Sequence, residues 1–426
     1  MHAVRLAAAP LALCLSLALH PVASIAAPPV VNCADDGPGS LRDAVAQANG
    51  GDTLDLTTLQ CSTITLTSGE IDILQHDLTL QGPGPGALTI SAGGASRVLK
   101  HGGSGQLSLR GLTIADGRYE SGFVARGGCI RSEGGTAYLF DTVVDNCTVI
   151  SSDDNAGGGG ISAGDVVLVA STVSGSRAIS TASDAYGGGV AAVSHVTAKY
   201  STIRANALEN GPGYTGVGAG FFAQDYAIVV GSTLEGNDAS CTSAMRSYSG
   251  ALVNDSTISG NHSERCAALS EFGDALTIAN STIAFNHVDS GDGAGVYFKG
   301  HALASTVTFE SSIIADNTSG AASTPADVHI EFGFLEGHDN LVMSLNGPPP
   351  PGVVTVTADP RLGPLQWNGG RTRTHALLAG SPAIGTGNAT LARPYDQRGV
   401  GYPRTTGPAT DIGALQFDTI FKGAFE

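Results

Sequence analysis

The sequence predicts an all-β protein, namely a right-handed parallel β-helix with a short N-terminal capping helix. One observation is a recurrent phrase of a small residue, Thr, a branched aliphatic residue, two variable positions and then Asn or Gly. Its central position recurs once per period, at Thr142, Thr172, Thr202, Thr233, Thr257, Thr282 and Ile313. Successive copies are separated by about 24 to 31 positions, a repeat length that indicates a solenoid. The second observation is that Gly-rich runs (such as residues 158–161) and β-forming runs (such as 166–169) alternate with this phrase, so each period holds three short strands and no crossover helix.

The coils are expected over residues 54–344. Strands of successive coils pair about 4.8 Å apart, and one coil can bury its apolar side only against its neighbours. The Asn after each phrase should therefore stack once per coil as a structural amide ladder, since Asn tolerates left-handed turns and can bond to the copies above and below. The predicted ladder consists of Asn146, Asn206, Asn237, Asn261, Asn286 and Asn317.

Residues 1–26 are typical of a Sec-type signal peptide. They contain a basic Arg5, an apolar run over residues 6–19 and small residues at the end. Such a run is too short to span a membrane. We therefore expect cleavage after Ala26 or Ala27, a secreted or cell-surface protein, and no integral membrane segment in the mature chain.

Residues 27–53 are expected to form an N-terminal cap, because the open end of a solenoid must be covered. Ser40 can cap a helix over residues 40–49, and Asp43 stands at the third helical position. Leu41 and Val45 belong to its apolar stripe, and Gly50 with Gly51 ends it.

Six of the seven cysteines lie outside the predicted signal peptide, an even number suited to an oxidising compartment. Six cysteines allow fifteen connectivities, and the spacing favours three local pairs. The expected disulfides are Cys33–Cys61, Cys129–Cys147 and Cys241–Cys266, the last joining adjacent coils.

The formal net charge of −17 argues against nucleic acid and anionic membranes as partners, because both bind basic surfaces. A polyanionic polysaccharide would also be repelled unless a divalent cation bridged it. An extracellular polysaccharide or a cell surface is the expected partner.

The C-terminal part of the chain departs from the repeat. Residues 358–415 carry the ordered phrases Asp359-Pro360-Arg361-Leu362-Gly363-Pro364-Leu365, Asn368-Gly369-Gly370, Thr374-His375-Ala376-Leu377-Leu378, Gly380-Ser381-Pro382-Ala383-Ile384, Asp396-Gln397-Arg398-Gly399 and Asp411-Ile412-Gly413-Ala414. This stretch closely resembles the C-terminal region of the choice-of-anchor Q family of bacterial secreted and surface β-helix proteins. The resemblance implies a pectin-lyase-like fold, a surface role and a closing cap over residues 345–415, and it brings no catalytic residue. Residues 416–426 are expected to be a tail.

One column of side chains could hold a metal ion. Asp238, His262 and His287 each follow a ladder Asn and are spaced one coil apart. Two imidazoles and a carboxylate are ligands that suit a transition metal. The alternative is that solvated turn residues align by chance. No cofactor is required by any motif, and Ca²⁺ or a transition metal is the only candidate.

The catalytic residues of an enzyme are not identifiable from the sequence. Candidate bases (Lys199, Arg204, Arg246, Lys299) and carboxylates (Asp225, Asp255, Asp274) exist, but the ordered motifs of polygalacturonase-like enzymes do not. The single Trp, Trp367, lies in the terminal region, and no extended aromatic platform is evident. The prediction is a non-catalytic adhesive or structural protein for which carbohydrate binding stays open. The alternatives are a polysaccharide lyase or glycoside hydrolase, and a metal-stiffened carbohydrate-binding module.

Overall fold

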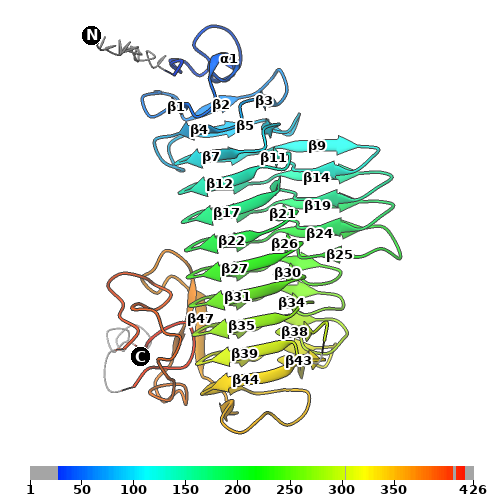
Figure 1. Ribbon diagram of the computed structural model, residues 1–426, viewed down its shortest axis with the longest axis vertical. Helices are drawn as coiled ribbons and strands as arrows, with labels where there is room; N and C mark the ends of the chain where they lie inside the picture. The colour runs from blue at the N-terminus through cyan, green and yellow to red at the C-terminus, as the bar shows by residue number, and fades with distance from the viewer. Residues whose placement is uncertain (1–26, 303, 406–408, 418–426) are drawn as a thin grey trace, which may run out of the picture.

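The computed structural model describes residues 27–302, 304–405 and 409–417, and it contains a parallel β-helix that winds from residue 53 to residue 356 (Figure 1). The predicted fold class is confirmed. The predicted signal peptide and most of the predicted tail, including residues 420–426, lie outside the described residues. No helix among the residues described is long and apolar enough to cross a membrane.

The predicted capping helix is α1 (Leu41–Gln47), and it buries Leu41, Ala44 and Val45. The Ser40 hydroxyl accepts a hydrogen bond from the Asp43 backbone N–H at 3.1 Å. The Asp43 carboxylate in turn accepts one from the Gly39 N–H. The helix begins where the capping residues of the sequence predict it.

Three long parallel sheets form the solenoid, and each complete coil contributes one strand to each, whereas β44, β45 and β46 at the end have no counterpart in the third sheet. Sheet A consists of β1 (Thr53–Asp55), β4 (Leu78–Gln81), β7 (Gln106–Arg110), β12 (Thr136–Phe140), β17 (Asp165–Val169), β22 (Val196–Lys199), β27 (Tyr226–Val230), β31 (Gly250–Asn254), β35 (Ala275–Ala279), β39 (Thr306–Glu310) and β44 (Phe334–His338). Sheet B consists of β2 (Thr63–Thr65), β5 (Thr89–Ser91), β8 (Thr113–Ala115), β13 (Val143–Asp145), β18 (Thr172–Ser174), β23 (Thr202–Arg204), β28 (Thr233–Glu235), β32 (Thr257–Ser259), β36 (Thr282–Ala284), β40 (Ile313–Ala315), β45 (Asn340–Val342) and β46 (Val354–Val356). Sheet C consists of β3 (Ile71–Ile73), β6 (Leu99–His101), β11 (Ile130–Ser132), β16 (Ile161–Ala163), β21 (Val190–Ala192), β26 (Phe221–Ala223), β30 (Met245–Ser247), β34 (Leu269–Glu271), β38 (Val296–Lys299) and β43 (Val328–Glu331).

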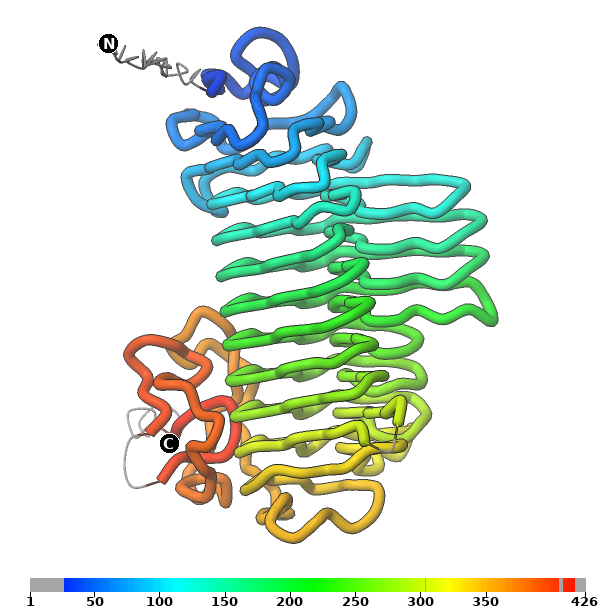
Figure 2. The backbone as a smooth tube through the Cα atoms, in the orientation of Figure 1, coloured from blue at the N-terminus to red at the C-terminus, as the bar shows by residue number. Residues whose placement is uncertain are grey.

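A lateral lobe projects from the solenoid between sheets B and C. Sheet D consists of β9 (Arg118–Ser121), β14 (Thr148–Ser151), β19 (Arg177–Ser180), β24 (Ala207–Asn210), β29 (Asp238–Ala239), β33 (His262–Ser263), β37 (His287–Val288), β41 (Thr318–Ser319) and β42 (Thr324–Pro325). Sheet E consists of β10 (Ala125–Arg126), β15 (Ala156–Gly157), β20 (Ala185–Tyr186) and β25 (Gly216–Val217). Figure 2 shows the longer coils reaching outward in this region. Sheet E ends at β25, which explains why the repeat becomes shorter after Thr233.

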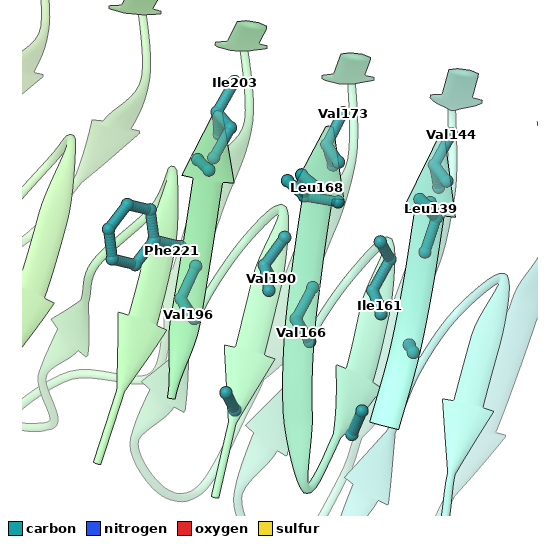
Figure 3. Close-up of a cluster of buried hydrophobic side chains, with 14 of the residues drawn as sticks. Leu139, Val144, Ile161, Val166, Leu168, Val173, Val190, Val196, Ile203 and Phe221 are labelled. Atoms are coloured by element: carbon teal, nitrogen blue, oxygen red, sulfur yellow. The ribbon is translucent and has the colours of Figure 1, made fainter. Parts of the chain in front are cut away.

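The core fills the interior of the coils. Figure 3 shows Leu139, Leu168, Val173, Ile203 and Phe221 among the apolar side chains that point into it. These side chains are fully buried. Side chains alternate along a strand, so the neighbours of these residues face outward and form the lateral surfaces of the protein.

The amide ladder forms, but Asn146 does not belong to it. Each ladder Asn side chain from Asn206 to Asn286 donates to the amide oxygen of the next one, at 2.8–3.0 Å, and Asn317 donates to Asp327. Asn146 instead bonds to Asp116 with its side chain exposed.

The prediction for Asn146 is wrong because the repeat phrase of this coil is displaced by one residue from the strand register. Thr172 pairs with Val143, not with Thr142, so the coil is one residue shorter than the phrase implies. In this register Asn146 takes the left-handed corner position, with φ 54°. The ladder position falls to Cys147, which is already held by a disulfide.

The three disulfides join the predicted pairs, Cys33–Cys61, Cys129–Cys147 and Cys241–Cys266. The last pair connects adjacent coils of the β-helix. Disulfides of this kind persist in oxidising compartments, in agreement with an extracellular protein.

The C-terminal segment does not close the end of the solenoid as expected. Only β46 extends the end of sheet B; the following chain turns back and packs against the outer face of that sheet, where β47 (Leu362–Gln366) and β48 (Thr374–Leu377) form an antiparallel hairpin (Figures 1 and 2). Thr233 Oγ1 donates to the Arg373 carbonyl, and Ser259 bonds to His375 at 2.8 Å. The outer side chains of sheet B from Thr233 onward provide the polar partners that hold the segment at the side.

Candidate functional site

A ladder of aromatic rings, which we call the ring ladder, follows the outer side of sheet C. It consists, in order, of Tyr186, Phe222, Tyr248, Phe272, Tyr297 and His329. Successive ring centroids lie 5.1, 5.8, 6.0, 5.5 and 5.5 Å apart. All six residues are half-buried, so part of each side chain is exposed to solvent. Each successive coil contributes one ring: Phe222, Tyr297 and His329 from strands of sheet C, Tyr248 and Phe272 from positions just after its strands, and Tyr186 from β20 of sheet E. The ring contacts, and not the strand register, therefore join the rings into a continuous aromatic edge along the solenoid.

A hollow of about 470 Å³ lies at the first end of the ring ladder. Tyr186, Phe222 and Tyr248 line one part of it, and Arg126 and Ala191 line another. The hollow exists because Ala191 occupies the outward position that Phe222 fills on the next coil. A small side chain beside large rings therefore leaves the ring faces open to a ligand.

Arg126 gives this hollow a hydrogen-bond donor. Burial lowers the pKa of its guanidinium below the usual value, and it has no ion pair among the described residues. Guanidinium groups donate through five N–H bonds in a fixed plane. The hollow thus combines aromatic faces with a donor that can reach hydroxyl or carboxylate oxygens.

Arg246 stiffens the middle of the ring ladder. Its guanidinium carbon lies 4.7 Å from the Tyr248 ring centroid and 3.5 Å from that of Phe272. The Arg246 residue is 7% exposed, and burial lowers its pKa. Cation–π contacts of this kind are stronger when they are desolvated. Arg246, one of the candidate bases, is therefore a structural cation of the ladder.

Glu271 lies beneath the ring ladder and is fully buried. Ser247 donates a hydrogen bond to its carboxyl group. Burial raises the pKa of Glu271 to about 7. The acid is therefore largely protonated in the folded protein below neutral pH.

Replacing Glu271 with Gln should flatten the pH dependence of stability. The pKa of this carboxyl is about 7 in the folded protein and 4.5 in the unfolded chain. The neutral carboxyl does not destabilise the folded protein at acidic pH, but the free energy of unfolding falls as the pH rises through about 7. The raised pKa corresponds to roughly 3 kcal/mol. In urea denaturation, the free energy of unfolding of wild type should fall by about this amount between about pH 5 and about pH 8. In Glu271→Gln this fall should be absent. Asp153→Asn, at an exposed carboxylate that does not act on Glu271, is the matched control; an equal loss in wild type and Glu271→Gln would contradict the assignment.

The predicted metal residues lie side by side on sheet D, where Asp238 pairs with His262 and His262 pairs with His287. His262 bonds to Asp238 through Nδ1 at 2.8 Å and to Asp289 through Nε2 at 3.2 Å. Burial lowers the pKa of His262, but these two carboxylates outweigh it and raise the pKa above the usual value. No group of three or more His, Cys, Asp or Glu side chains in the described part of the chain is arranged to hold a metal ion. Metal binding stays a prediction.

The other candidate bases and carboxylates do not converge. Lys199 pairs in register with Val230, five residues beyond Asp225, so the two groups lie about 16 Å apart along the sheet. Lys299 bonds to Glu331 at 2.8 Å. Asp255 is buried against Arg404. The side-chain groups that the sequence suggested for cleavage chemistry therefore serve separate contacts.

The ring ladder is the feature that the sequence interpretation missed. Phe222, Tyr248, Phe272 and Tyr297 follow one another at intervals close to the coil length. This spacing was the available signal. Tyr186 and Phe222 line a groove, whereas Phe221 is a core residue and Tyr200 contacts Arg393 of the C-terminal segment.

Comparisons with known proteins assign no activity, substrate or partner to the chain. No protein-family model matches the chain, and no curated protein matches it. Among solved structures, the crystal structure of pectate lyase Pel9A is similar with a TM-score of 0.45 and 14% sequence identity, covering 92% of this chain and 98% of that chain. This similarity is too low to carry a conclusion about activity.

Proposed function

We propose that this protein is an extracellular, non-catalytic β-helix that binds a neutral polysaccharide along the ring ladder. The observation that carries the proposal is the ladder itself, six partly exposed rings in one line with an open hollow and Arg126 at its end. Sugar rings bury their apolar C–H faces against aromatic side chains, while their hydroxyls accept from groups such as a guanidinium. A repeating polymer suits a surface that repeats once per coil.

The charge of the protein favours a neutral polymer over an acidic one. The net charge of −17 repels polyanions over the distances at which encounter occurs. The Lys299 ammonium on the ladder is already paired with Glu331, so it adds no free cation. An extracellular location is supported by the three disulfides, by the signal-like residues 1–26 and by the resemblance of residues 358–415 to choice-of-anchor Q proteins.

Affinity electrophoresis in gels that contain neutral polysaccharides tests this function. Wild type should be retarded by at least one of xylan, glucomannan, β-glucan or galactan, and Phe222→Ala with Tyr248→Ala should restore free migration. Tyr214→Ala is the matched control, because Tyr214 is 42% exposed and lies outside the ring ladder. Free migration of wild type in every gel, or equal retardation of the double variant, would refute the proposal. Release of reducing ends or of unsaturated products would refute the non-catalytic part.

A further inference from the structure

A second hollow, which we call the sheet B groove, lies on a different side of the solenoid. Its volume is about 450 Å³. The floor is the outer face of β13, β18 and β23, with Asp145, Thr172 and Thr202 among its side chains. Trp367 and Arg373, from the hairpin of the C-terminal segment, form the wall. The groove lies where the segment bonds to sheet B at Thr233, next to the outer faces of β13, β18 and β23, which form its floor.

Glu235 is a buried carboxylate at the end of this groove. Its side chain is 4% exposed, and Arg373 pairs with Oε1 only. Oε2 has no hydrogen-bond partner among the described residues. Buried polar atoms are nearly always hydrogen-bonded. A carboxylate oxygen without a partner beside a groove therefore indicates that a ligand supplies the donor.

The remaining groups define the chemistry of that donor. Two carboxylates (Asp145 and Glu235) and two guanidinium groups (Arg204 and Arg373) line the groove, so their formal charges cancel. Arg373 is paired with Glu235, and the Arg204 side chain is exposed. Trp367 is 65% exposed and offers an indole face. A ring with apolar faces and several hydroxyls matches a surface that offers an indole, an acceptor and a donor.

We propose that the sheet B groove is a second saccharide-binding site, in which one neutral sugar residue stacks on Trp367. Its hydroxyls accept from Arg204 and donate to Asp145 and Glu235. The ligand class rests on the proposed carbohydrate-binding function, but the site lies on another sheet and uses other residues. The C-terminal segment contributes Trp367 and Arg373, so the site is complete only when that segment is docked.

Tryptophan fluorescence tests this site separately, because Trp367 is the only Trp in the chain. The full-length protein is titrated with soluble neutral pentasaccharides of glucose, xylose, mannose and galactose. A saturable change in Trp emission is expected with at least one of them. Arg204→Ala should weaken binding about ten-fold or more. Lys199→Ala, an exposed cation on the neighbouring sheet, should leave the dissociation constant unchanged.

Two further variants separate the two sites. The double variant Phe222→Ala, Tyr248→Ala should keep the change in Trp367 emission. Adding Trp367→Ala to this double variant should abolish the heat of pentasaccharide binding measured by calorimetry. Absence of any emission change and any binding heat with all four sugars would overturn the second site. An unchanged dissociation constant in Arg204→Ala would do the same, whatever the gels report for the ring ladder.

Discussion

Replacing Arg404 with Ala should detach the C-terminal segment from sheet B. Arg404 donates to the Gly413 carbonyl at 2.7 Å and pairs with Asp255 of the solenoid, and the two side chains are 1% and 3% exposed. Removing one partner of a buried ion pair leaves the other charge without compensation, which costs about 3–5 kcal/mol. The expected result is new proteolytic cleavage within residues 357–417 while the coils stay resistant.

The cost of the Arg404→Ala change should grow with pH. Burial already raises the pKa of Asp255 above the usual value, although Arg404 opposes this effect. Without Arg404 the pKa rises further, so the carboxyl is neutral at acidic pH and its ionisation destabilises the docked segment as the pH increases. Proteolysis of the variant should therefore be slower at about pH 5 than at about pH 8, after correction for protease activity.

Matched variants make this test specific. Arg371→Ala should change stability by less than about 1 kcal/mol, because the Arg371 side chain is 68% exposed and its ion pair with Asp141 is screened by solvent. The double variant Arg404→Met, Asp255→Leu should recover most of the loss, since no buried charge is left. Equal cleavage of wild type and Arg404→Ala would show that the pair does not hold the segment.

Replacing Asn261 with Ala should break the amide ladder at its centre. Asn261 Oδ1 accepts from the backbone N–H and from Nδ2 of Asn237, at 3.0 and 2.9 Å. The change leaves the Asn237 backbone N–H and one of the two Nδ2–H groups buried without an acceptor, at about 1–3 kcal/mol for each, while the other Nδ2–H still donates to the Ile203 carbonyl. We expect the free energy of unfolding, measured by urea denaturation, to fall by roughly 3–4 kcal/mol.

Two variants check that hydrogen bonding, and not side-chain volume, is responsible for the Asn261 effect. Asn49→Ala removes the same atoms at an exposed position and should have little effect. Asn261→Asp keeps the shape but cannot donate to Asn286. Its stability should decline with rising pH, as implied by Asp327 at the end of the ladder, where burial raises the pKa to about 6. Equal effects of Asn261→Ala and Asn49→Ala would show that the ladder contributes nothing.

Local patterns identified much of this architecture because each depends on residues close in the chain or one coil apart. The Ser40 cap, the coil period and the cysteine spacing all belong to this kind. Asn146 shows the limit of such patterns. Its phrase fits the repeat at either of two registers, and only the pairing of Val143 with Thr172 decides between them.

The candidate sites could be read from the sequence only in part. The spacing of Phe222, Tyr248 and Phe272 carries the coil period and could have indicated the ring ladder. Nothing in the sequence indicates that Trp367 and Arg204 line the same groove, since this arrangement depends on where the C-terminal segment packs. A segment without a repeat has no neighbouring copy that determines its register.

The sequence by itself determined the parallel β-helix, its N-terminal helix and its disulfides, because a periodic chain can bury its apolar positions only by stacking like on like. Only the tertiary structure decided that the C-terminal segment lies along sheet B rather than across the end of the solenoid. That choice depends on polar partners far apart in sequence, such as Thr257 with Gln397 and Asp255 with Arg404. Burial of these groups is favourable only when each is hydrogen-bonded or ion-paired, so the segment packs where these partners lie. This position of the segment forms the groove beside Trp367.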